Sequence, residues 1–189
     1  MGHAGGRAGE AAQALSTPLP AAVRIRPEEP ADHAGVRAVN VAAFETAAEA
    51  DLVEALRARA RPLVSLVAEE AGAIVGHIMF SPVTLPGHPT LALMGLAPLA
   101  VTPARQRTGI GSALVEAGLA ACRRLGAAAV VVLGHPGYYP HFGFAPGVRV
   151  VLDCEYDVPA EAFMVLELRP GALRSASGRV QYHAAFASL

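Results

Sequence analysis

The feature that most constrains the fold is an unbroken apolar run, Ala127 to Leu133, that directly follows a helix-forming segment. Such a run is typical of a strand that is buried on both faces of a sheet. The segment before it, from Gly109 to Leu125, has helix-forming composition and is followed by Gly126, a common stop signal. A further strand is expected over Leu91 to Val101, so strand, crossover helix and buried strand form a βαβ unit.

Shorter patterns on either side of this unit predict the remaining elements. Strands are expected at residues 23–26, 63–69, 73–83, 148–154 and 163–168, and the second and third of these form a hairpin. Helices are expected from Asp32, a suitable cap, to Phe44 and over residues 47–59. The chain is therefore predicted to be a mixed α/β protein, with a mostly antiparallel central sheet of about seven strands flanked by helices.

The composition also suggests how the chain is divided. Residues 1–22 are rich in Ala and Gly and contain almost no large apolar residue, so we expect a flexible N-terminal arm. Residues 23–170 hold all the predicted strands and form the domain, and residues 171–189 are expected to be a C-terminal extension that packs on it.

Charge and cysteine content argue against several classes of protein. Fifteen Arg balance sixteen acidic residues and there is no Lys, so the net charge of −1 does not indicate a nucleic-acid partner. No apolar run approaches the ~18 residues of a membrane helix, and the N-terminus lacks a signal-peptide pattern, so a cytoplasmic location without membrane attachment is expected. Cys122 and Cys154 are interpreted as reduced structural thiols, and neither the Cys nor the His residues have metal-ligand spacing.

The loop between the predicted strand and its helix has the features of a phosphate-binding turn. Gly109 and Gly111 stand where the first helical turn presents unpaired N–H groups and the positive end of the helix dipole. A Walker loop is excluded because it needs a Lys, and a dinucleotide fingerprint fails because Leu114 replaces its third Gly. A simple glycine-containing helix cap is the alternative interpretation.

Two motifs carry a resemblance to a known family. Gln106-x-x-Gly109-x-Gly111 resembles the Gln/Arg-x-x-Gly-x-Gly/Ala signature of the GNAT superfamily of N-acetyltransferases. Downstream, the segment from Tyr139 to Phe144 resembles the family's Tyr-x-x-x-Gly-Phe segment. The order of elements agrees from Val23 to about Leu168, and the chain looks like a bacterial branch of predicted acetyltransferases with the acyl-CoA N-acyltransferase fold.

The resemblance implies acetyl-coenzyme A as co-substrate, without a metal, and a set of binding residues. The donor strand should separate from its neighbour to pair with pantetheine, with Pro98 at a bulge, and the turn should hold the pyrophosphate. The implied cofactor-binding residues are Leu99, Ala100, Val101, Gln106, Arg107, Thr108, Gly109, Ile110, Gly111, Ser112 and Tyr138. Tyr139 aligns with the tyrosine that protonates the leaving thiolate, although Val132 replaces an Asn that is common seven residues earlier. Tyr138 is the substitute acid, and two core aromatic residues are the alternative interpretation.

A general base for the amine is also expected, and His135 ranks first because it lies close to Tyr139 in the sequence. The other candidates are Glu69, Glu70, His77, His88 and His141, with a hydrogen-bonded core histidine as the alternative for His77. On the substrate side the resemblance implies a lining of Phe44, Glu45, Glu49 and Asp51, which would suit a cationic amine; a solvated helix face is the alternative.

The predicted function is therefore transfer of the acetyl group of acetyl-CoA to a primary amine of a small molecule or a protein N-terminus. Two other hypotheses remain open: a non-catalytic acyl-CoA-binding or sensor module, and an interaction protein in which the glycine turn is only a cap. The sequence also leaves a homodimer open.

Overall fold

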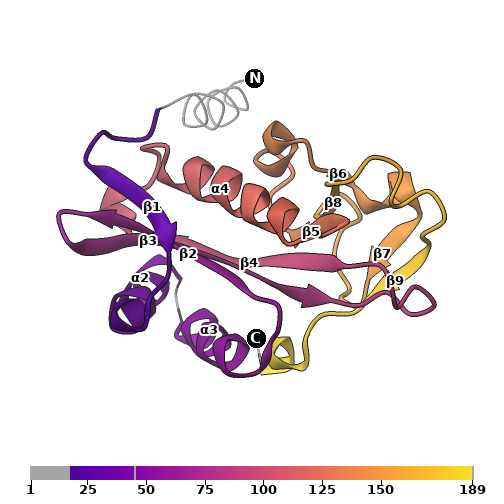
Figure 1. The fold of residues 1–189 in the computed structure, drawn as a ribbon, viewed down its shortest axis with the longest axis horizontal. Coiled ribbons are helices and arrows are strands. Elements are labelled where there is room, and N and C mark those ends of the chain that lie inside the picture. Colours follow the sequence, from indigo (N-terminus) through magenta and orange to yellow (C-terminus); the bar gives the residue numbers. More distant parts are fainter. Residues whose placement is uncertain (1–17, 45, 189) are drawn as a thin grey trace, which may run out of the picture.

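The computed structural model describes residues 18–44 and 46–188, and its main feature is a seven-stranded sheet (Figure 1). The strand order is β1 (Val23–Pro27), β2 (Val64–Glu70), β3 (Ala73–Val83), β4 (Leu93–Val101), β5 (Ala129–Leu133), β8 (Phe163–Glu167) and β6 (Ala145–Pro146). Neighbouring strands are antiparallel except β4 and β5, which are parallel and joined by a helix. The predicted mixed α/β fold with a mostly antiparallel sheet of about seven strands is confirmed.

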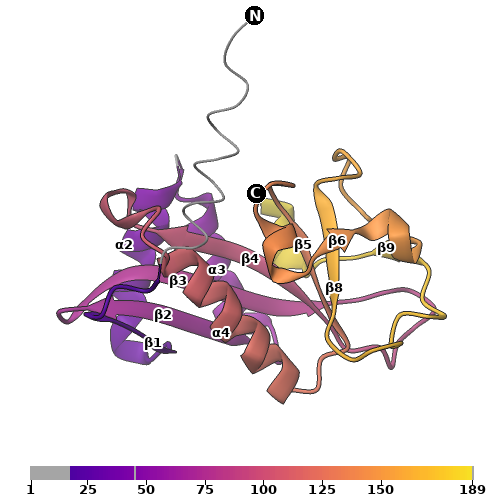
Figure 2. The ribbon, with the colours of Figure 1, turned by 90° about the horizontal axis from the view of Figure 1, so that it is seen from above.

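Helices cover both faces of this sheet. In Figure 1, α2 (His33–Ala43) and α3 (Ala48–Arg59) lie below the sheet, and α4 (Ile110–Arg124) lies above it. Figure 2 shows α4 running across the strands when the molecule is seen from above. The C-terminal turn η5 (Ala184–Ser188) packs beside α3, although the two are far apart in the sequence. Both lie on the face of the sheet opposite α4.

Strand β3 shows how the two faces divide the core, because successive side chains of a strand point to opposite faces. Ile78 and Phe80 are fully buried and pack in one cluster with Leu114 of α4. Met79, between them, is also fully buried but packs in another cluster with Leu56 of α3. The centre of β3, from Ile78 to Phe80, is therefore apolar on both faces, as a strand between two helical layers requires.

The crossover helix α4 begins and ends within one residue of the predicted limits. Gly109 precedes it with a φ of 87°, a left-handed conformation that glycine adopts at little cost. Arg123 and Arg124 lie in its last turn, where the helix dipole favours positive charge. Both cysteines are buried and free, as predicted, and burial raises the pKa of Cys122 on this helix to about 12.

The predicted strand over residues 148–154 is correct only at its end. Residues 147–150 form a 3-10 turn, η4 (Gly147–Val150), and only β7 (Leu152–Cys154) is extended. A Cβ at Gly147 would lie 2.5 Å from the Phe163 ring, so the chain meets β8 here by close packing and then turns away. Strand β7 leaves the main sheet and pairs in parallel with β9 (Gly178–Val180), a strand that the sequence did not predict.

Asp32 occupies the N-cap position of α2, but its side chain makes no capping hydrogen bond to that helix. Instead Arg26 donates two hydrogen bonds to its carboxylate, at 2.6 and 2.8 Å, and the Glu29 N–H donates a third at 2.8 Å. Two hydrogen bonds from one guanidinium to the two carboxylate oxygens join two charged groups, and this contact takes the place of the cap. The same hydrogen bonds from Arg26 lower the pKa of Asp32 to about 2.

Residues near both ends of the described chain pack against the domain. Residues 1–17 of the predicted arm lie outside the described residues, whereas Leu19 packs against the core on the α4 side. Phe186, in the predicted C-terminal extension, is 6% exposed and packs against the α3 face. No helix in residues 18–44 and 46–188 is long and apolar enough to cross a membrane.

Candidate active site

The two central strands, β4 and β5, pair over only part of their length. Their register runs from Leu93 opposite Ala129 to Leu96 opposite Val132. Strand β4 then continues to Val101, still paired with β3, so among the described residues its other edge has no strand partner beyond Leu96 and is open. The β3–β4 register shifts opposite the stretch that contains Pro98, where a missing N–H suits an irregular ladder.

The open edge of β4 carries backbone groups that point away from β3. The Thr102 N–H donates to the Val75 carbonyl at 3.0 Å, on the β3 side. The carbonyl of Val101 accepts instead from the Gln106 side-chain amide at 3.1 Å, on the other side. Because the N–H and C=O of one strand residue point the same way and successive residues alternate, the N–H groups of Val101 and Leu99 face the open edge.

The turn after β4 places the first turn of α4 at the end of this open edge. Arg107, at φ 61°, and Gly109, at φ 87°, both adopt left-handed conformations that bend the chain sharply. The Thr108 hydroxyl donates to the Arg105 carbonyl at 2.6 Å, and Arg105 itself is paired with Glu70. These contacts hold the turn in shape.

The start of α4 has free donors. The first helical hydrogen bond runs from the Ala113 N–H to the Gly109 carbonyl at 3.0 Å. The N–H groups of Ile110, Gly111 and Ser112 before it therefore have no partner within the helix. Together with the dipole, such an end forms a binding site for a phosphate group.

Tyr138 lies over this helix end. A Cβ at Gly111 would stand 3.1 Å from the Tyr138 hydroxyl oxygen, so Gly111 leaves room for the aromatic side chain. Burial raises the pKa of Tyr138, and the Ser112 hydroxyl beside it opposes part of that shift. Tyr138 thus connects the helix start with the cavity described below.

Tyr139 belongs to the short turn η3 (Tyr139–Phe142) and is 8% exposed. Its ring packs edge-to-face with Tyr138 and with Phe144, at centroid distances of 5.1 and 5.6 Å. A Cβ at Gly134 would lie 2.2 Å from the ring, so only glycine fits there. Burial raises the pKa of Tyr139 well above its ordinary value, which keeps the hydroxyl neutral and able to donate.

Two of the candidate bases lie beside these tyrosines. His135 lines the cavity and its Nδ1 accepts a hydrogen bond from the Gly137 N–H at 3.0 Å. In the neutral ring the proton is therefore on Nε2, and neither nitrogen has a free lone pair. His141 is exposed, outside the cavity lining, and its Nδ1 lies 3.1 Å from the Tyr138 carbonyl.

The other four candidate bases lie outside the cavity lining. Glu69 accepts a hydrogen bond from Arg26 at 2.6 Å, and Glu70 is paired with Arg105. His77 is fully buried with its Nε2 2.9 Å from the Ser65 hydroxyl, so the interpretation as a core histidine is confirmed. His88 lines a different pocket, formed around residues 82–94.

One cavity, of about 700 Å³, joins these features. All four tyrosines of the chain line it, together with Phe44 and Phe186. Its other lining residues are Glu49, Leu52, Leu96, Ala97, Pro98, Leu99, Leu133, Gly134, His135 and Val158. One part is formed by the open edge of β4 and the segment after β5, and the other by α3, the loop after β7 and the C-terminal tail.

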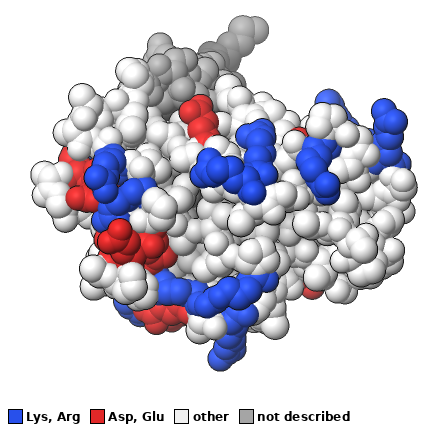
Figure 3. Space-filling model, in the orientation of Figure 1, with Lys and Arg blue, Asp and Glu red and all other residues white. Residues whose placement is uncertain are grey.

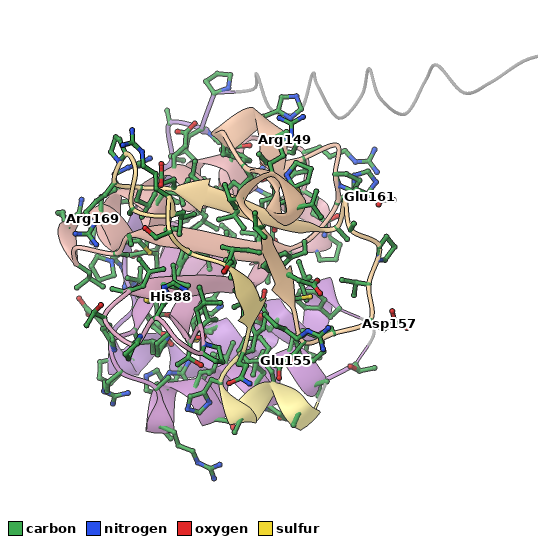
Figure 4. All side chains as sticks on the ribbon, turned by 90° about the vertical axis from the view of Figure 1, so that its right-hand side faces the viewer. His88, Arg149, Glu155, Asp157, Glu161 and Arg169 are labelled. Atoms are coloured by element: carbon green, nitrogen blue, oxygen red, sulfur yellow. The ribbon has the colours of Figure 1, made fainter. Side chains whose placement is uncertain are left out.

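The lining residues from the last part of the chain, Tyr156, Val158, Tyr182 and Phe186, were not expected from the sequence. Figure 4 shows the end of the molecule where their segments meet, with Glu155 just above the C-terminal turn. The Glu155 carboxylate accepts a hydrogen bond from the Tyr182 N–H at 2.6 Å and so ties the tail to the loop after β7. All four tyrosines lie outside the predicted helices and strands, and this signal could have indicated Tyr156 and Tyr182 but not Val158 or Phe186.

On the predicted substrate edge, the structure places Phe44 and Glu49 in the lining but not Asp51. Asp51 instead accepts a hydrogen bond from Arg37 at 2.9 Å on an exposed helix face. For this residue the structure therefore agrees with the alternative interpretation, a solvated helix face. Glu45 lies outside the described residues.

Charged side chains of both signs are scattered over the face in Figure 3, with wide uncharged areas between them. Within the described part of the chain, no cluster of His, Cys, Asp and Glu could hold a metal ion. The groups that the site offers a ligand are thus an aromatic cavity, the backbone N–H groups of the open β4 edge and the N-terminal end of α4.

Known proteins are similar to this chain in sequence and in fold. The model of the Acetyltransferase (GNAT) family matches residues 29–144. The uncharacterized N-acetyltransferase YhbS of Escherichia coli K12 is 39% identical over 163 residues, covering 86% of this chain and 97% of YhbS. The crystal structure of E. coli YhbS in complex with CoA has a TM-score of 0.83 at 37% identity, covering 90% of this chain and 95% of that one. A GNAT family acetyltransferase from Brucella melitensis, in complex with acetyl-CoA, has a TM-score of 0.72 at 41% identity, covering 87% and 97%.

Proposed function

Because the chain belongs to the GNAT family and is an acetyl-CoA-dependent N-acetyltransferase, we propose that a primary amine attacks the thioester directly and takes the acetyl group. The observation that carries this proposal is the early end of the β4–β5 pairing, at Leu96 opposite Val132. It opens a strand edge between the start of α4 and the tyrosine-lined cavity. The similar proteins crystallised with CoA and with acetyl-CoA support this donor.

The donor is bound, in this proposal, at two places. The free N–H groups at the start of α4, from Ile110 to Ser112, bind the pyrophosphate, and Gly109 and Gly111 keep side chains off it. The preceding turn residues, Gln106 to Thr108, shape the approach. The backbone of β4 over Leu99 to Val101 pairs with the pantetheine amides at its open edge.

The catalytic groups are the backbone of β4 and a tyrosine. Attack on the thioester gives a tetrahedral oxyanion, which an N–H group of the open edge, near Val101, stabilises. Tyr139 donates its proton toward the leaving sulfur. The raised pKa of Tyr139 keeps this proton in place until negative charge develops on the sulfur.

The proton balance needs no external acid. The attacking nitrogen loses one proton when the amide forms, and the coenzyme A sulfur gains one when it leaves. Tyr139 therefore returns to its neutral form by receiving a proton that the nitrogen has released. The hydrogen bond from Gly137 to His135 Nδ1 argues against His135 as the first acceptor of that proton.

The experiment that tests the proposal measures thiol release from acetyl-CoA in the presence of a panel of primary amines and short peptides. Amine-dependent release, with the acetylated amine identified by mass spectrometry, supports it. Binding of acetyl-CoA without release by any amine would favour the non-catalytic acyl-CoA-binding or sensor module. The choice between a small-molecule amine and a protein N-terminus is read from the same panel.

The division into an arm of residues 1–22, a domain of residues 23–170 and an extension of residues 171–189 stays a prediction. A cytoplasmic location and a homodimer also stay predictions.

A further inference from the structure

The half of the cavity away from the open β4 edge has an unusual composition. It is formed by α3, the loop after β7 and the C-terminal tail, and it carries the aromatic residues Phe44, Tyr156, Tyr182 and Phe186. Glu49 is the only Asp, Glu, Lys or Arg side chain among the described residues that line the whole cavity. A ligand of this half therefore meets aromatic faces and one carboxylate.

Glu49 is held with one oxygen turned to the interior. It lies in the first turn of α3, three residues before Leu52, which also lines the cavity. Its Oε2 is buried and has no hydrogen-bond partner among the described residues. A buried carboxylate oxygen without a partner is costly, so this atom calls for a donor from a ligand.

Tyr182 presents a second such atom. Its hydroxyl oxygen is buried and also lacks a hydrogen-bond partner among the residues described. Its ring packs between Tyr156 and Phe186, at centroid distances of 5.5 and 5.2 Å, and its backbone N–H is held by Glu155. The side chain is thus fixed in place, and burial raises its pKa so that the hydroxyl stays neutral.

We propose that this half of the cavity recognises a primary amine carried on a small aromatic body, with Glu49 binding the ammonium group and Tyr182 accepting a second hydrogen bond from it. The proposal rests on the proposed function, because it names the acceptor of the same reaction. An ammonium group supplies several N–H donors, and aromatic faces attract a cation within about 6 Å of their centroids. The aromatic body of the substrate fills the remaining apolar space.

The same composition disfavours amines that carry an anionic group. Among the described residues, no Arg side chain lines the cavity, and the chain has no Lys. An amino acid would place its carboxylate near Glu49 without a cation to pair with it, which costs free energy on transfer from water. An amino sugar would leave several hydroxyl groups without partners against aromatic rings.

The reaction step follows from this binding mode. The bound ammonium loses one N–H bond, and its proton passes to the Glu49 carboxylate. The freed nitrogen lone pair forms the new bond to the thioester carbon, and the carbon–sulfur bond breaks with its electron pair on sulfur. The sulfur gains a proton from Tyr139, and the nitrogen of the adduct loses its second proton, which returns to Tyr139. The proton on Glu49 passes to solvent, so the products are a neutral amide, the free thiol and one released proton.

The test compares three variants with the unchanged enzyme, using 2-phenylethylamine as acceptor and thiol release as the assay. Glu49→Gln is expected to raise the KM for the amine by about tenfold or more, to lower kcat because the proton acceptor is removed, and to leave the KM for acetyl-CoA unchanged. Tyr182→Phe is expected to raise the amine KM by a smaller factor. Asp51→Asn, two residues away on the same helix but outside the cavity lining, is the matched control and should change neither value.

Comparing acetylation rates of related amines tests the predicted substrate class directly. The unchanged enzyme should acetylate 2-phenylethylamine faster than phenylalanine, which adds only a carboxylate, and faster than glucosamine. Equal or better use of phenylalanine or glucosamine would overturn the proposal while the proposed function stands. An unchanged amine KM and kcat in Glu49→Gln would overturn it as well.

Calorimetric titration of 2-phenylethylamine into the CoA-bound protein separates recognition from turnover. Binding that weakens in Glu49→Gln but not in Asp51→Asn, without thiol release, would support the recognition site and overturn the proposed catalysis. Absence of both binding and release would overturn both.

Discussion

A Cβ added at Gly111 would stand 3.1 Å from the hydroxyl oxygen of Tyr138, which places this aromatic side chain directly over the first turn of α4. The close approach links the two sequence motifs, because one supplies the glycine and the other begins immediately after the tyrosine. The start of the helix and the cavity are thus parts of one surface.

Gly111→Ala is therefore expected to weaken CoA binding by about tenfold, or about 1.4 kcal/mol, because its methyl group displaces Tyr138 and crowds the free N–H groups. Calorimetric titration of CoA measures the change. The double variant Gly111→Ala, Tyr138→Phe removes the hydroxyl that the methyl group meets. If phosphate binding is blocked by the methyl group itself, the double variant stays weak; full recovery would mean that only the displaced tyrosine mattered.

Tyr139→Phe removes one hydroxyl from a well-packed aromatic cluster and should leave the fold intact. If Tyr139 protonates the leaving sulfur, kcat falls by about 10²-fold while CoA affinity is unchanged. Steady-state kinetics with titration of CoA checks both values. Tyr138→Phe is the paired variant: a larger loss of kcat there than in Tyr139→Phe would assign the acid to Tyr138.

His135→Ala is expected to leave the shape of the pH–rate profile unchanged. The Gly137 N–H occupies Nδ1 at 3.0 Å, and the neutral ring then carries its proton on Nε2, so no lone pair is free to accept a proton from the amine. The kcat/KM for the amine measured across the pH range checks this. Disappearance of a limb of the profile would restore His135 as the base.

The βαβ unit and the glycine turn could be predicted because their signals are local. An unbroken apolar run indicates a buried strand, and Gly109 marks the helix start whatever the rest of the chain does. The walls of the acceptor half could not be predicted in this way. Tyr156 and Tyr182 reach the cavity from segments without a regular period, and their position depends on packing against α3 and on the hydrogen bond to Glu155.

The strand predicted over residues 148–154 failed for a related reason. Its apolar residues suit a strand, but Val148 and Val151 are 63% and 68% exposed, and Val151 has a left-handed φ of 58°. The close contact of Gly147 with Phe163 directs the chain away from the sheet before a strand can form. Such a contact joins distant segments and leaves no pattern in the local sequence.

His77 provides a prediction on stability rather than activity. Its ring is fully buried, with Nδ1 3.2 Å from the Asn40 amide nitrogen and Nε2 2.9 Å from the Ser65 hydroxyl. The amide donates to Nδ1, the Nε2–H donates to Ser65, and the Ser65 hydroxyl donates to Glu28. This order satisfies a neutral ring, and burial, with a contribution from Arg57, lowers the pKa of His77 to about 3.

The sign of the pH effect follows from that pKa. Below the ordinary value of 6.5 the unfolded chain binds a proton at His77 that the folded chain does not bind. The free energy of unfolding therefore falls as the pH is lowered from 6.5 toward 3, by at most about 1.4 kcal/mol per pH unit from this residue. Asp32, whose pKa is lowered from 3.8 to about 2, adds its own loss only below about pH 4.

Urea unfolding of the unchanged protein and of His77→Gln between pH 7 and pH 4.5 separates these contributions. The variant loses a buried hydrogen-bonded ring and should be less stable at pH 7, but its stability should fall less steeply with decreasing pH. His141→Gln, which changes an exposed ring, is the control and should keep the full slope. Parallel curves for the unchanged protein and His77→Gln would mean that the buried ring is not what couples this fold to pH, and that the slope comes from other groups.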